Sequence, residues 1–403
     1  MTFSRLTYLV IGLVLVIIIG GVYYFSTLTT TNPSTGETRS VFGALFPFLG
    51  SNPTEAPGGS DDEIPGEIDT RPVPKLRLVT ENPVAGAYFV DNSTTTTDIR
   101  FVERETGHVF DTPTTGFNTT RISNTTIPRI QEVVWETGKA FIIRYLSDEG
   151  AVQNFLATIA STSPEQTLSG KFLGAFDRVS VSADGKKIFT VTETPEGSRL
   201  ESTNADGTKP KTLFASPIRS WVPITNANTP LIQTAPSSGI PGFLYSLGSQ
   251  GVLVPLISNE PGLMTLPSPS GKYILYSTGA GNTVTLSVFE TKTEEHLDLP
   301  LQTVASKCVW FPKNEPLIFC GAPNSVPQSN YPDDWLIGFT SFSDSAWVID
   351  PVAGTAKRVS YLQDEAGRSI DVFEPRVNDR GEYALFMNKS DLSLWSLKLE
   401  ISQ

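Results

Sequence analysis

A recurring pattern of polar turn residues and apolar pairs runs through residues 75–400 of the chain. At seven places a Gly or Asn marks a turn, and the third and fourth residues after it are both apolar. Adjacent residues of a strand point to opposite faces of a sheet, so each of these strands is predicted to be covered on both faces. The turn residues of the pattern are Gly86, Gly138, Gly185, Asn228, Gly271, Asn314 and Gly381.

The clearest copies of the turn read SADGKKI at residues 182–188 and SPSGKYI at residues 268–274. Gly, Asn, Asp and Lys suit the tight hairpin that leads into such a strand. A second hairpin of weaker pattern follows in several repeats, at residues 99–110, 286–297 and 347–359. Each repeat is therefore predicted to contain about four short strands.

The spacing of the turns indicates the architecture. Successive turns are 52, 47, 43, 43, 43 and 67 residues apart. A four-stranded sheet of roughly 40–50 residues, covered on both faces by its like, is a propeller blade. A two-sheet sandwich, the alternative, would bury one face of each strand and show alternating apolar and polar residues. The sequence thus predicts an all-β fold over residues 75–400, a seven-bladed β-propeller of four-stranded antiparallel blades.

The two ends of the repeat region predict how the ring closes. Residues 391–400 supply a third strand for the last repeat, and few residues follow them. Residues 75–80 precede the first turn by too much to begin the first blade in the ordinary way. They are therefore predicted to form the outer strand of blade 7, which removes open sheet edges.

At these turns the chain resembles a known family. SADGKKI and SPSGKYI resemble the SPDGK-x-I repeats of TolB-like and related WD40-like (PD40-type) β-propellers, over about residues 75–400. With its apolar N-terminal segment, the whole chain is similar to uncharacterised single-pass bacterial membrane proteins. The resemblance implies a fold and a topology. It carries over no functional residues, because such propellers serve many unrelated functions.

Residues 6–25 form an uncharged apolar segment. Twenty residues in a helix span about 30 Å, the hydrocarbon thickness of a bilayer. Tyr8 at one end, and Tyr23, Tyr24 and Phe25 at the other, suit the two membrane interfaces. We expect a transmembrane helix. The alternative is a cleaved signal peptide, whose apolar region is usually shorter and followed by small residues.

Basic residues flank this segment unequally. Arg5 and the terminal amine lie on its N-terminal side, and the next basic residue after it is Arg39. The positive-inside rule then places residues 1–5 in the cytoplasm and everything after residue 25 outside it. The expected localisation is the cell membrane, with a single span and an extracytoplasmic propeller.

Residues 26–74 are expected to be a disordered linker. They are rich in Thr, Pro, Gly and acidic residues, and they cannot bury enough apolar surface to offset the entropy lost on ordering. One apolar patch, residues 41–50, interrupts this composition. It is too short to span a membrane. It would lie in the membrane interface, dock on the folded domain or remain an apolar part of the linker.

Charge and composition narrow the chemistry. The net charge of −12 and pI near 4.8 count against nucleic-acid binding, which needs basic surface. Two Cys and two His leave no visible metal motif, and no G-x-S-x-G nucleophile motif occurs. His108 and His296 fall in predicted turns without a visible base or nucleophile. We therefore expect no metal, no cofactor and no catalytic residue.

Two classes of function remain open at this point. The first is a binding or scaffolding module for a protein or envelope partner. The second is a glycan-processing or other propeller enzyme with acidic residues at the channel mouth. The absence of a converging catalytic motif favours binding. The mouth of the central channel discriminates between them. Three or more carboxylates that converge there with an Arg or His favour the enzyme, and a flat or aromatic face favours binding.

Cys308 and Cys320 are predicted to form a disulfide. The hairpin of blade 6 turns near residues 312–315, and this register places the two residues directly opposite each other. Opposed residues of paired strands lie close to the separation that a disulfide requires. Outside the cytoplasm such a pair can oxidise. The alternative is two buried, reduced cysteines.

Blade 6 carries an unusually long loop. The spacing from Asn314 to Gly381 exceeds the usual 43 residues by 24. The additional residues fall between the second and third strands, at about residues 320–346. In a propeller this loop shares a face with the connections between blades, among them the long connection at residues 111–129. Long loops on a rigid scaffold are where binding residues concentrate.

The sequence NYPDDW at residues 330–335 makes this loop the candidate binding loop. Tyr331 and Trp335 offer apolar contact area with a polar group, and Asp333 and Asp334 lie between them. The alternative is that Trp335 folds back to cap its own blade and Asp333 caps a turn, because large aromatic residues are usually mostly buried.

Overall fold

The computed structural model of the protein describes residues 29–31, 38–40, 71–91, 93, 95–159, 167–225 and 230–400. The chain divides into two units, Met1–Glu67 and Ile68–Gln403. The predicted transmembrane helix at residues 6–25, the N-terminal residues 1–5 and the apolar patch at residues 41–50 lie outside the described residues. Among the residues that are described, no helix is both long enough and apolar enough to cross a bilayer.

In the first unit, residues 29–40 contain one short antiparallel pair. β1 (Thr29–Thr31) pairs with β2 (Thr38–Ser40), with Thr30 opposite Arg39. The pair lies within residues 26–74, for which the composition predicts a disordered linker, and that linker stays a prediction. β-branched Thr residues favour strands.

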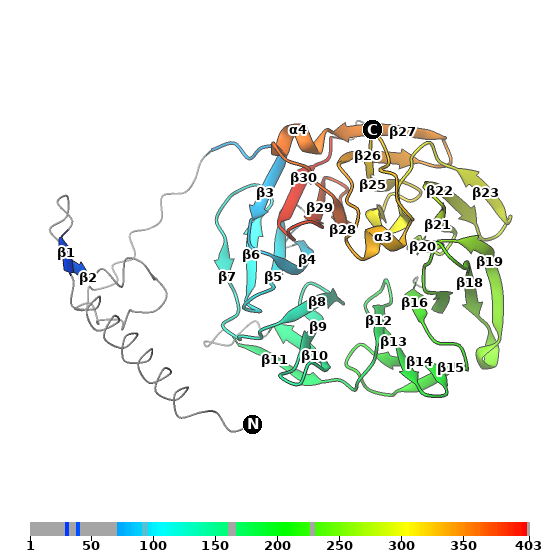
Figure 1. Ribbon diagram of the computed structural model, residues 1–403. Coiled ribbons are helices and arrows are strands. Elements are labelled where there is room, and N and C mark those ends of the chain that lie inside the picture. Colours follow the sequence, from blue (N-terminus) through cyan, green and yellow to red (C-terminus); the bar gives the residue numbers. More distant parts are fainter. Residues whose placement is uncertain are drawn as a thin grey trace, which may run out of the picture. The chain divides into compact units, whose positions relative to one another are not determined.

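The second unit folds into seven four-stranded antiparallel sheets arranged in a ring (Figure 1). The seven-bladed propeller predicted by the repeat is confirmed. Each of blades 1 to 6 consists of four consecutive strands. From the inner to the outer strand, the first three blades are β4 (Val84–Asp91), β5 (Thr97–Glu103), β6 (Val109–Pro113) and β7 (Thr120–Arg121); β8 (Ile130–Trp135), β9 (Ala140–Leu146), β10 (Val152–Ile159) and β11 (Leu168–Phe172); and β12 (Arg178–Val181), β13 (Lys187–Thr194), β14 (Gly197–Asn204) and β15 (Lys211–Ser216).

The next three blades follow the same order. They are β16 (Trp221–Thr225), β17 (Pro230–Thr234), β18 (Pro241–Leu247) and β19 (Leu253–Pro261); β20 (Met264–Pro267), β21 (Tyr273–Ala280), β22 (Thr283–Glu290) and β23 (Glu295–Asp298); and β24 (Cys308–Trp310), β25 (Ile318–Pro323), β26 (Asp344–Asp350) and β27 (Thr355–Ser360). The described helices are short: the 3₁₀ helices η1 (Ser249–Gly251) and η2 (Ala305–Lys307), and the α-helices α3 (Asp333–Leu336) and α4 (Leu362–Ala366).

Blade 7 is closed by the start of the propeller domain. Its first three strands, counted from the inner one, are β28 (Val372–Val377), β29 (Tyr383–Asn388) and β30 (Leu394–Lys398). Its outer strand is β3 (Leu76–Thr80). The register pairs Leu76 with Leu397 and Leu78 with Trp395. The predicted closure is thus confirmed. Because β3 covers β30, the ring presents no unpaired strand at this junction.

The blades bury their apolar residues between one another. Ile274 and Leu275 are adjacent in β21, and both are fully buried. Ile274 packs in a cluster with residues of blade 4, whereas Leu275 packs in a cluster with residues of blade 6. Seven such clusters join each blade to the next around the ring. This is the physical reason for the apolar pairs in the sequence.

Blade 1 differs in one respect from the repeat predicted from the sequence. Gly86 is not a turn residue; it lies inside β4, the inner strand of blade 1. Consequently, residues 99–110 contain the second and third strands of this blade and not the third and fourth. Inner strands are also covered on both faces, so they show the same apolar pair. A Cβ on Gly86 would lie 2.6 Å from the carbonyl oxygen of Val133, so close packing requires glycine here. The fourth turn residue, Asn228, lies outside the described residues.

Alternating strand direction gives the ring two distinct faces. The connection face carries the loops between second and third strands and the links from one blade to the next. The turn face carries the turns that join first to second and third to fourth strands. The predicted connection at residues 111–129 is corrected by this topology, because it contains β7. Only residues 122–129 lie on the connection face.

Candidate functional site

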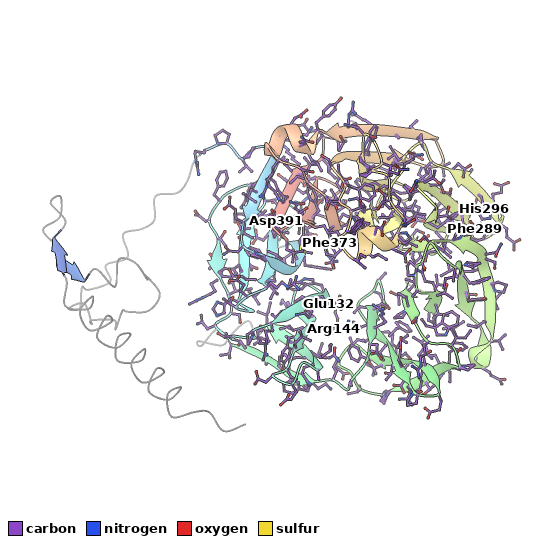
Figure 2. The ribbon with its side chains drawn as sticks, viewed as in Figure 1. Glu132, Arg144, Phe289, His296, Phe373 and Asp391 are labelled. Atoms are coloured by element: carbon purple, nitrogen blue, oxygen red, sulfur yellow. A yellow bond between two sulfur atoms is a disulfide. The ribbon has the colours of Figure 1, made fainter. Side chains whose placement is uncertain are left out.

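A cavity of about 1030 Å³ opens on the connection face, at the mouth of the central channel. The inner strands of blades 1, 2 and 7 form its floor, and the long loop of blade 6 forms one wall. Much of its lining is apolar and includes Val84, Ile130, Leu146, Phe373 and Met387. We call this space the connection-face cavity. Figure 2 shows Phe373 beside the middle of the ring.

Three β-bulges lie along the floor of this cavity. In β4 the register shifts between Val84 and Gly86, and in β8 it shifts between Ile130 and Glu132. In β28 it shifts between Phe373 and Arg376. The pairings of the other four inner strands contain no such shift. A bulge bends its strand and redirects a side chain, and bulges concentrate next to functional sites.

The bulge in β28 places Glu374 at the inner end of the cavity. Glu374 has a φ of 48°, a left-handed backbone that residues other than glycine rarely adopt. Pro375 follows it, which restricts the backbone further. A strained backbone of this kind persists only where the surrounding structure enforces it, and such positions cluster at binding and active sites.

The surroundings of Glu374 perturb its titration. The carboxyl is enclosed by neighbouring blades, although it stays open to solvent through the cavity. This enclosure raises the pKa of Glu374 to about 7; the Arg376 guanidinium opposes the rise and the Glu132 carboxylate adds to it. Glu374 is therefore partly protonated near neutral pH, and it can donate or accept a hydrogen bond.

Two other carboxylates of the cavity already have partners. Glu132 forms an ion pair with Arg144, the residue opposite it in β9, and both lie toward the middle of the ring in Figure 2. Asp391 lies 3.0 Å from Arg368. Glu374, in contrast, makes no hydrogen bond or ion pair with any other described residue. It is the acid at the inner end of the cavity that is left for a ligand.

The basic residues of the cavity show a similar contrast. Arg104 donates a hydrogen bond of 2.9 Å to a backbone carbonyl of β8, and Arg129 pairs with Asp148. The Lys389 ammonium lies 5.0 Å from the ring centre of Trp335. It has no hydrogen-bond partner among the described residues. Burial lowers the pKa of Lys389, although the nearby Asp371 carboxylate opposes this effect. Among the described residues, the cavity lining thus holds two acids without a side-chain partner, Glu374 and the exposed Glu105, and one such base, Lys389.

Sequence comparisons place this chain in no family: no family model matches it, and no curated protein does. Solved structures share its fold. The propeller is similar to streptogramin B lyase, with 11% identity over 81% of this chain and 97% of that chain and a TM-score of 0.50. It is equally similar to the β-propeller domain of the Trilobed protease from Pyrococcus furiosus, with 11% identity over 79% and 96% of the two chains and a TM-score of 0.50.

TolB from Acinetobacter baumannii is a further structural neighbour, with 10% identity over 79% of this chain and 64% of that chain and a TM-score of 0.42. At these identities the likeness shows the fold alone. The function has to be argued from the site.

The candidate binding loop, residues 324–343, lies on the connection face, between β25 and β26. Tyr331 and Trp335 are fully buried, and they pack in one cluster with Phe342. The Tyr331 hydroxyl donates to the Pro327 carbonyl at 2.6 Å, and the Trp335 indole N–H donates to Asp371 at 3.0 Å. The rings therefore hold the loop together, as in the alternative given for Trp335. Their role in binding stays a prediction.

The acidic residues of the loop also make internal contacts. Asp333 accepts a hydrogen bond of 2.5 Å from the backbone N–H of Ser238, in a loop of blade 4. Asp334 accepts hydrogen bonds from the Ser329 hydroxyl and the Asn330 N–H, at 2.7 and 2.8 Å. These bonds lower the pKa of Asp334. Both carboxylates fasten the loop in place.

The exposed apolar residues of this loop follow directly after the buried ones. Leu336, the last residue of α3, lines the connection-face cavity. Ile337 and Phe339 are 78% and 80% exposed. The position of these residues was missed by sequence reasoning, because aromatic character had pointed to Tyr331 and Trp335. The loop therefore presents an apolar rim beside the cavity, which we call the α3 rim (Leu336, Ile337 and Phe339).

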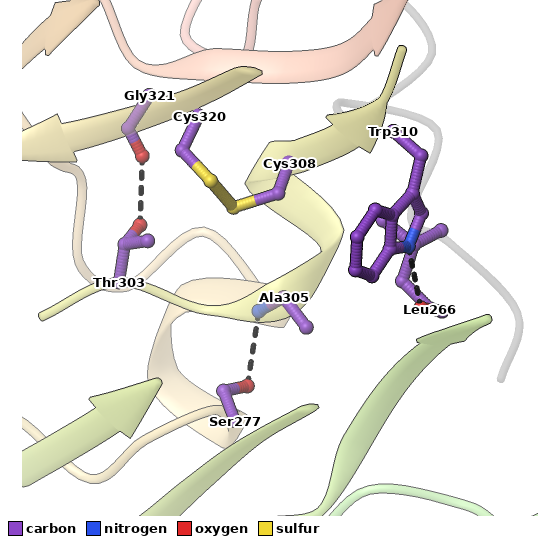
Figure 3. Close-up of a disulfide and its surroundings, with 8 residues drawn as sticks. All are labelled: Leu266, Ser277, Thr303, Ala305, Cys308, Trp310, Cys320 and Gly321. Atoms are coloured by element: carbon purple, nitrogen blue, oxygen red, sulfur yellow. Dashed lines mark hydrogen bonds between the residues drawn. A yellow bond between two sulfur atoms is a disulfide. The ribbon is translucent and has the colours of Figure 1, made fainter. Parts of the chain in front are cut away.

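The structure contains a disulfide between Cys308 and Cys320, the pair indicated by the hairpin register (Figure 3). It joins β24 to β25. Nearby, Thr303 donates to the Gly321 carbonyl at 2.8 Å, and the N–H of Ala305 donates to Ser277 at 3.0 Å. The bond lies in the wall of the propeller and fastens the first two strands of blade 6.

Neither histidine lines the connection-face cavity. His296 is in β23, at the outer edge of blade 5 (Figure 2), and it shares a hydrogen bond of 2.9 Å with the Tyr276 hydroxyl. His108 shares one of 3.3 Å with the Thr126 hydroxyl. Among the described residues, no three His, Cys, Asp or Glu side chains gather closely enough to hold a metal ion.

Glu374, Glu132 and Lys389 were missed by sequence reasoning. One signal was available: the strand VFEPRV carries a Glu, a Pro and an Arg, although inner strands are otherwise largely apolar. Proline is rare inside a sheet except at edges and bulges. Charged residues next to such a proline could have marked the channel.

Proposed function

We propose that the chain is a membrane-tethered, extracytoplasmic propeller that binds a segment of a protein partner in the cell envelope. The segment enters the connection-face cavity. The observation that carries this proposal is the apolar cavity itself, which holds the unpaired Glu374 at its inner end and the exposed α3 rim at its edge. A rigid scaffold with an apolar pocket and few polar groups is the usual form of a binding site.

The lining of the cavity favours binding over nucleophilic catalysis. Among the described residues that line it, Ser390 has the only hydroxyl side chain, and neither His nor Cys is present. A serine nucleophile requires an adjacent base that is itself oriented by a third group. No such set exists in the described lining.

The α3 rim favours a protein over a small molecule as the partner. Exposed apolar residues beside a pocket are typical of protein interaction sites. The cavity can take the apolar side chains of a peptide. Glu374 can accept a hydrogen bond from a peptide amide or an amine, and Lys389 can donate one to a carbonyl or carboxylate.

The topology sets the face on which the described chain enters the propeller. β3 begins at the turn face and runs toward the connection face, because it is an outer strand. Residues 71–75, which precede β3, therefore join the propeller on the turn face, opposite the cavity.

Photo-crosslinking in intact cells tests this proposal. A photoreactive amino acid at Phe339 is expected to yield a discrete crosslinked protein. The same residue at Val352, which is 61% exposed on the turn face, serves as the control and is expected to yield none. Crosslinking at Phe339 is expected to fall severalfold in Glu374→Gln. Equal crosslinking from both positions would contradict the proposed face.

A second candidate function, a glycan-processing enzyme, is favoured by one observation. Glu374 has a pKa of about 7, and the Glu132 carboxylate lies close enough to contribute to that rise. A protonated acid beside a second carboxyl group is the arrangement of glycoside hydrolases. Release of reducing ends from envelope polysaccharides, lost in both Glu374→Gln and Glu132→Gln, would establish the enzyme. No release by the wild-type chain leaves the binding proposal.

A further inference from the structure

The central channel opens a second time, on the turn face, in a cavity of about 630 Å³ that we call the turn-face mouth. Its lining includes Tyr88, Lys139, Trp310 and Arg376. A narrower space of about 410 Å³ joins it to the connection-face cavity, and Arg376 also borders that space. The turn-face mouth shares none of the proposed binding residues, and an inference about it goes beyond the proposed function.

Arg376 is the central charged group of this mouth. It lies in β28, and its side chain makes no hydrogen bond or ion pair with any described residue. Its guanidinium carbon lies 5.2 Å from the ring centre of Tyr88, so the planar group is held against an aromatic surface. A guanidinium fixed in this way keeps its N–H donors available to an incoming anion.

The acids of the mouth are already neutralised by other cations. Asp379 forms an ion pair of 2.7 Å with Lys313, and Asp91 lies 3.6 Å from Arg380. Lys139, in contrast, is exposed and has no ion pair in the described part of the chain. Two unpaired cations, Arg376 and Lys139, thus remain at one opening of a chain whose net charge is −12.

Glu374 is the acid that faces Arg376 most directly, from two residues earlier in β28. It lines the connection-face cavity and the narrow space, but it does not line the turn-face mouth. The channel is therefore polarised along its axis, with an acid toward the connection face and a guanidinium toward the turn face. The guanidinium side attracts anions, and the electrostatic field in such a cleft is stronger than on an open surface.

The walls around the cations are apolar. Phe89, Trp310, Pro269 and Pro312 line the mouth with Tyr88. We propose that the turn-face mouth binds an anionic group, a carboxylate or a phosphate, on an apolar or aromatic body. Arg376 contacts the anion, Lys139 contributes from the rim, and the aromatic walls contact the body.

Ligand-observed NMR on the detergent-solubilised full chain tests this site. The probes are benzoate, phenyl phosphate and inorganic phosphate, with benzyl alcohol as the neutral match of benzoate. Benzoate and phenyl phosphate are expected to bind, and benzyl alcohol is not. The anion that binds more tightly shows whether the site prefers a carboxylate or a phosphate. Inorganic phosphate is expected to bind more weakly than phenyl phosphate, because it cannot contact the walls.

Matched variants locate the binding. Arg376→Gln is expected to weaken benzoate binding by about tenfold or more, the size of one lost charge-assisted hydrogen bond. Lys139→Gln, at an exposed position, is expected to weaken it severalfold. Lys357→Gln, on an outer strand away from the mouth, is the control and is expected to change nothing. Unchanged benzoate binding in Lys139→Gln and Arg376→Gln, or equal binding of benzyl alcohol, would overturn the proposal.

Discussion

At Glu374 both the backbone and the side chain depart from what an inner propeller strand requires. The left-handed φ of 48° costs conformational free energy, and the carboxyl occupies a space that apolar residues usually line. Pro375 removes a backbone donor, which a bulge tolerates because its extra residues pair with nothing. Among the described residues, this is where strain, a perturbed pKa and a cavity coincide.

Glu136 shows a related effect at a site without strain. One of its carboxyl oxygens is buried and has no hydrogen-bond partner among the described residues. Burial raises the pKa of Glu136 to about 7, and the Asp206 carboxylate adds to the rise. A raised pKa means that the folded state binds the extra proton. Its contribution to stability is therefore full below about pH 4.5 and is lost as the pH rises through about 7.

We predict that Glu136→Gln stabilises the protein at pH 8 and not at pH 5. At pH 8 the wild type carries a buried charge that Gln removes, worth about 2 kcal/mol in the free energy of unfolding. At pH 5 both side chains are neutral. Thermal unfolding at the two pH values measures the difference, with the exposed Glu295→Gln as the control. A gain of equal size at both pH values would contradict the assigned cause.

The short helix α3 depends on a buried ionic network. Lys307 is fully buried, lies 2.7 Å from Asp344 and forms a second ion pair with Asp371. Asp371 also accepts the indole N–H of Trp335, which fixes the loop to blade 7. Burial raises the pKa of Asp344 to about 6; Lys307 opposes the rise and Asp371 adds to it. The network therefore carries one more acid than it can neutralise.

We predict that Lys307→Met is far more destabilising than Asp344→Asn. Removal of the lysine leaves the buried Asp344 and Asp371 carboxylates without their ion-pair partner and costs about 3–5 kcal/mol in the free energy of unfolding. Asparagine at position 344 keeps an acceptor for the N–H of Val372 and leaves one balanced pair. Urea unfolding followed by tryptophan fluorescence measures both. Similar losses in the two variants would show that charge balance is not the cause.

We predict that the disulfide of blade 6 forms in the purified protein and stabilises it. Protein purified from an oxidising compartment, denatured and alkylated without reductant, is expected to gain no alkyl groups by intact mass. Cys308→Ala with Cys320→Ala is expected to lower the free energy of unfolding by about 3 kcal/mol, since the bond closes a loop with a sequence separation of 12 residues. A gain of two alkyl groups would mean that the cysteines are reduced.

At the scale of the whole ring, closure by β3 decides whether the propeller is a single cooperative body. Without β3, strand β30 would become an open edge that presents unpaired backbone groups to other chains. The apolar residues Leu76 and Leu78 would also leave the clusters that they share with blade 7.

We predict that a chain beginning at residue 71 folds into a monomeric propeller and that one beginning at residue 82 does not. The shorter chain lacks β3 and is expected to aggregate or to melt at a much lower temperature. Light scattering after size exclusion, together with thermal unfolding, measures both. Equal behaviour of the two chains would show that β3 is dispensable.

The proposed membrane orientation makes a prediction for the intact cell. Protease added outside is expected to release the propeller as a fragment whose first residue lies within residues 26–74. The composition of these residues predicts a linker that is cut more readily than a closed ring. Cleavage that requires lysis would reverse the orientation. The propeller itself is expected to stay whole in both samples.

The sequence alone determined the ring. Blade number, closure by residues 75–80 and the opposed cysteines all follow from local signals, because turn residues and paired apolar residues report directly on strands covered on two faces. The same signal failed at Gly86. An inner strand is covered on both faces as well, so an apolar pair cannot tell a first strand from a second one.

Only the tertiary structure decided the site. Glu374 and Glu132 meet in the channel although they lie in blades 7 and 2, and no local pattern joins them. A bulge depends on how one strand is aligned with its neighbour. The composition of a single strand does not determine that register. Trp335 is buried because it donates a hydrogen bond to Asp371 and packs against Phe342. The polar residues beside it in the sequence would instead have suggested an exposed position. Strands are encoded locally, whereas the cavity arises from contacts between blades that only the closed ring brings together.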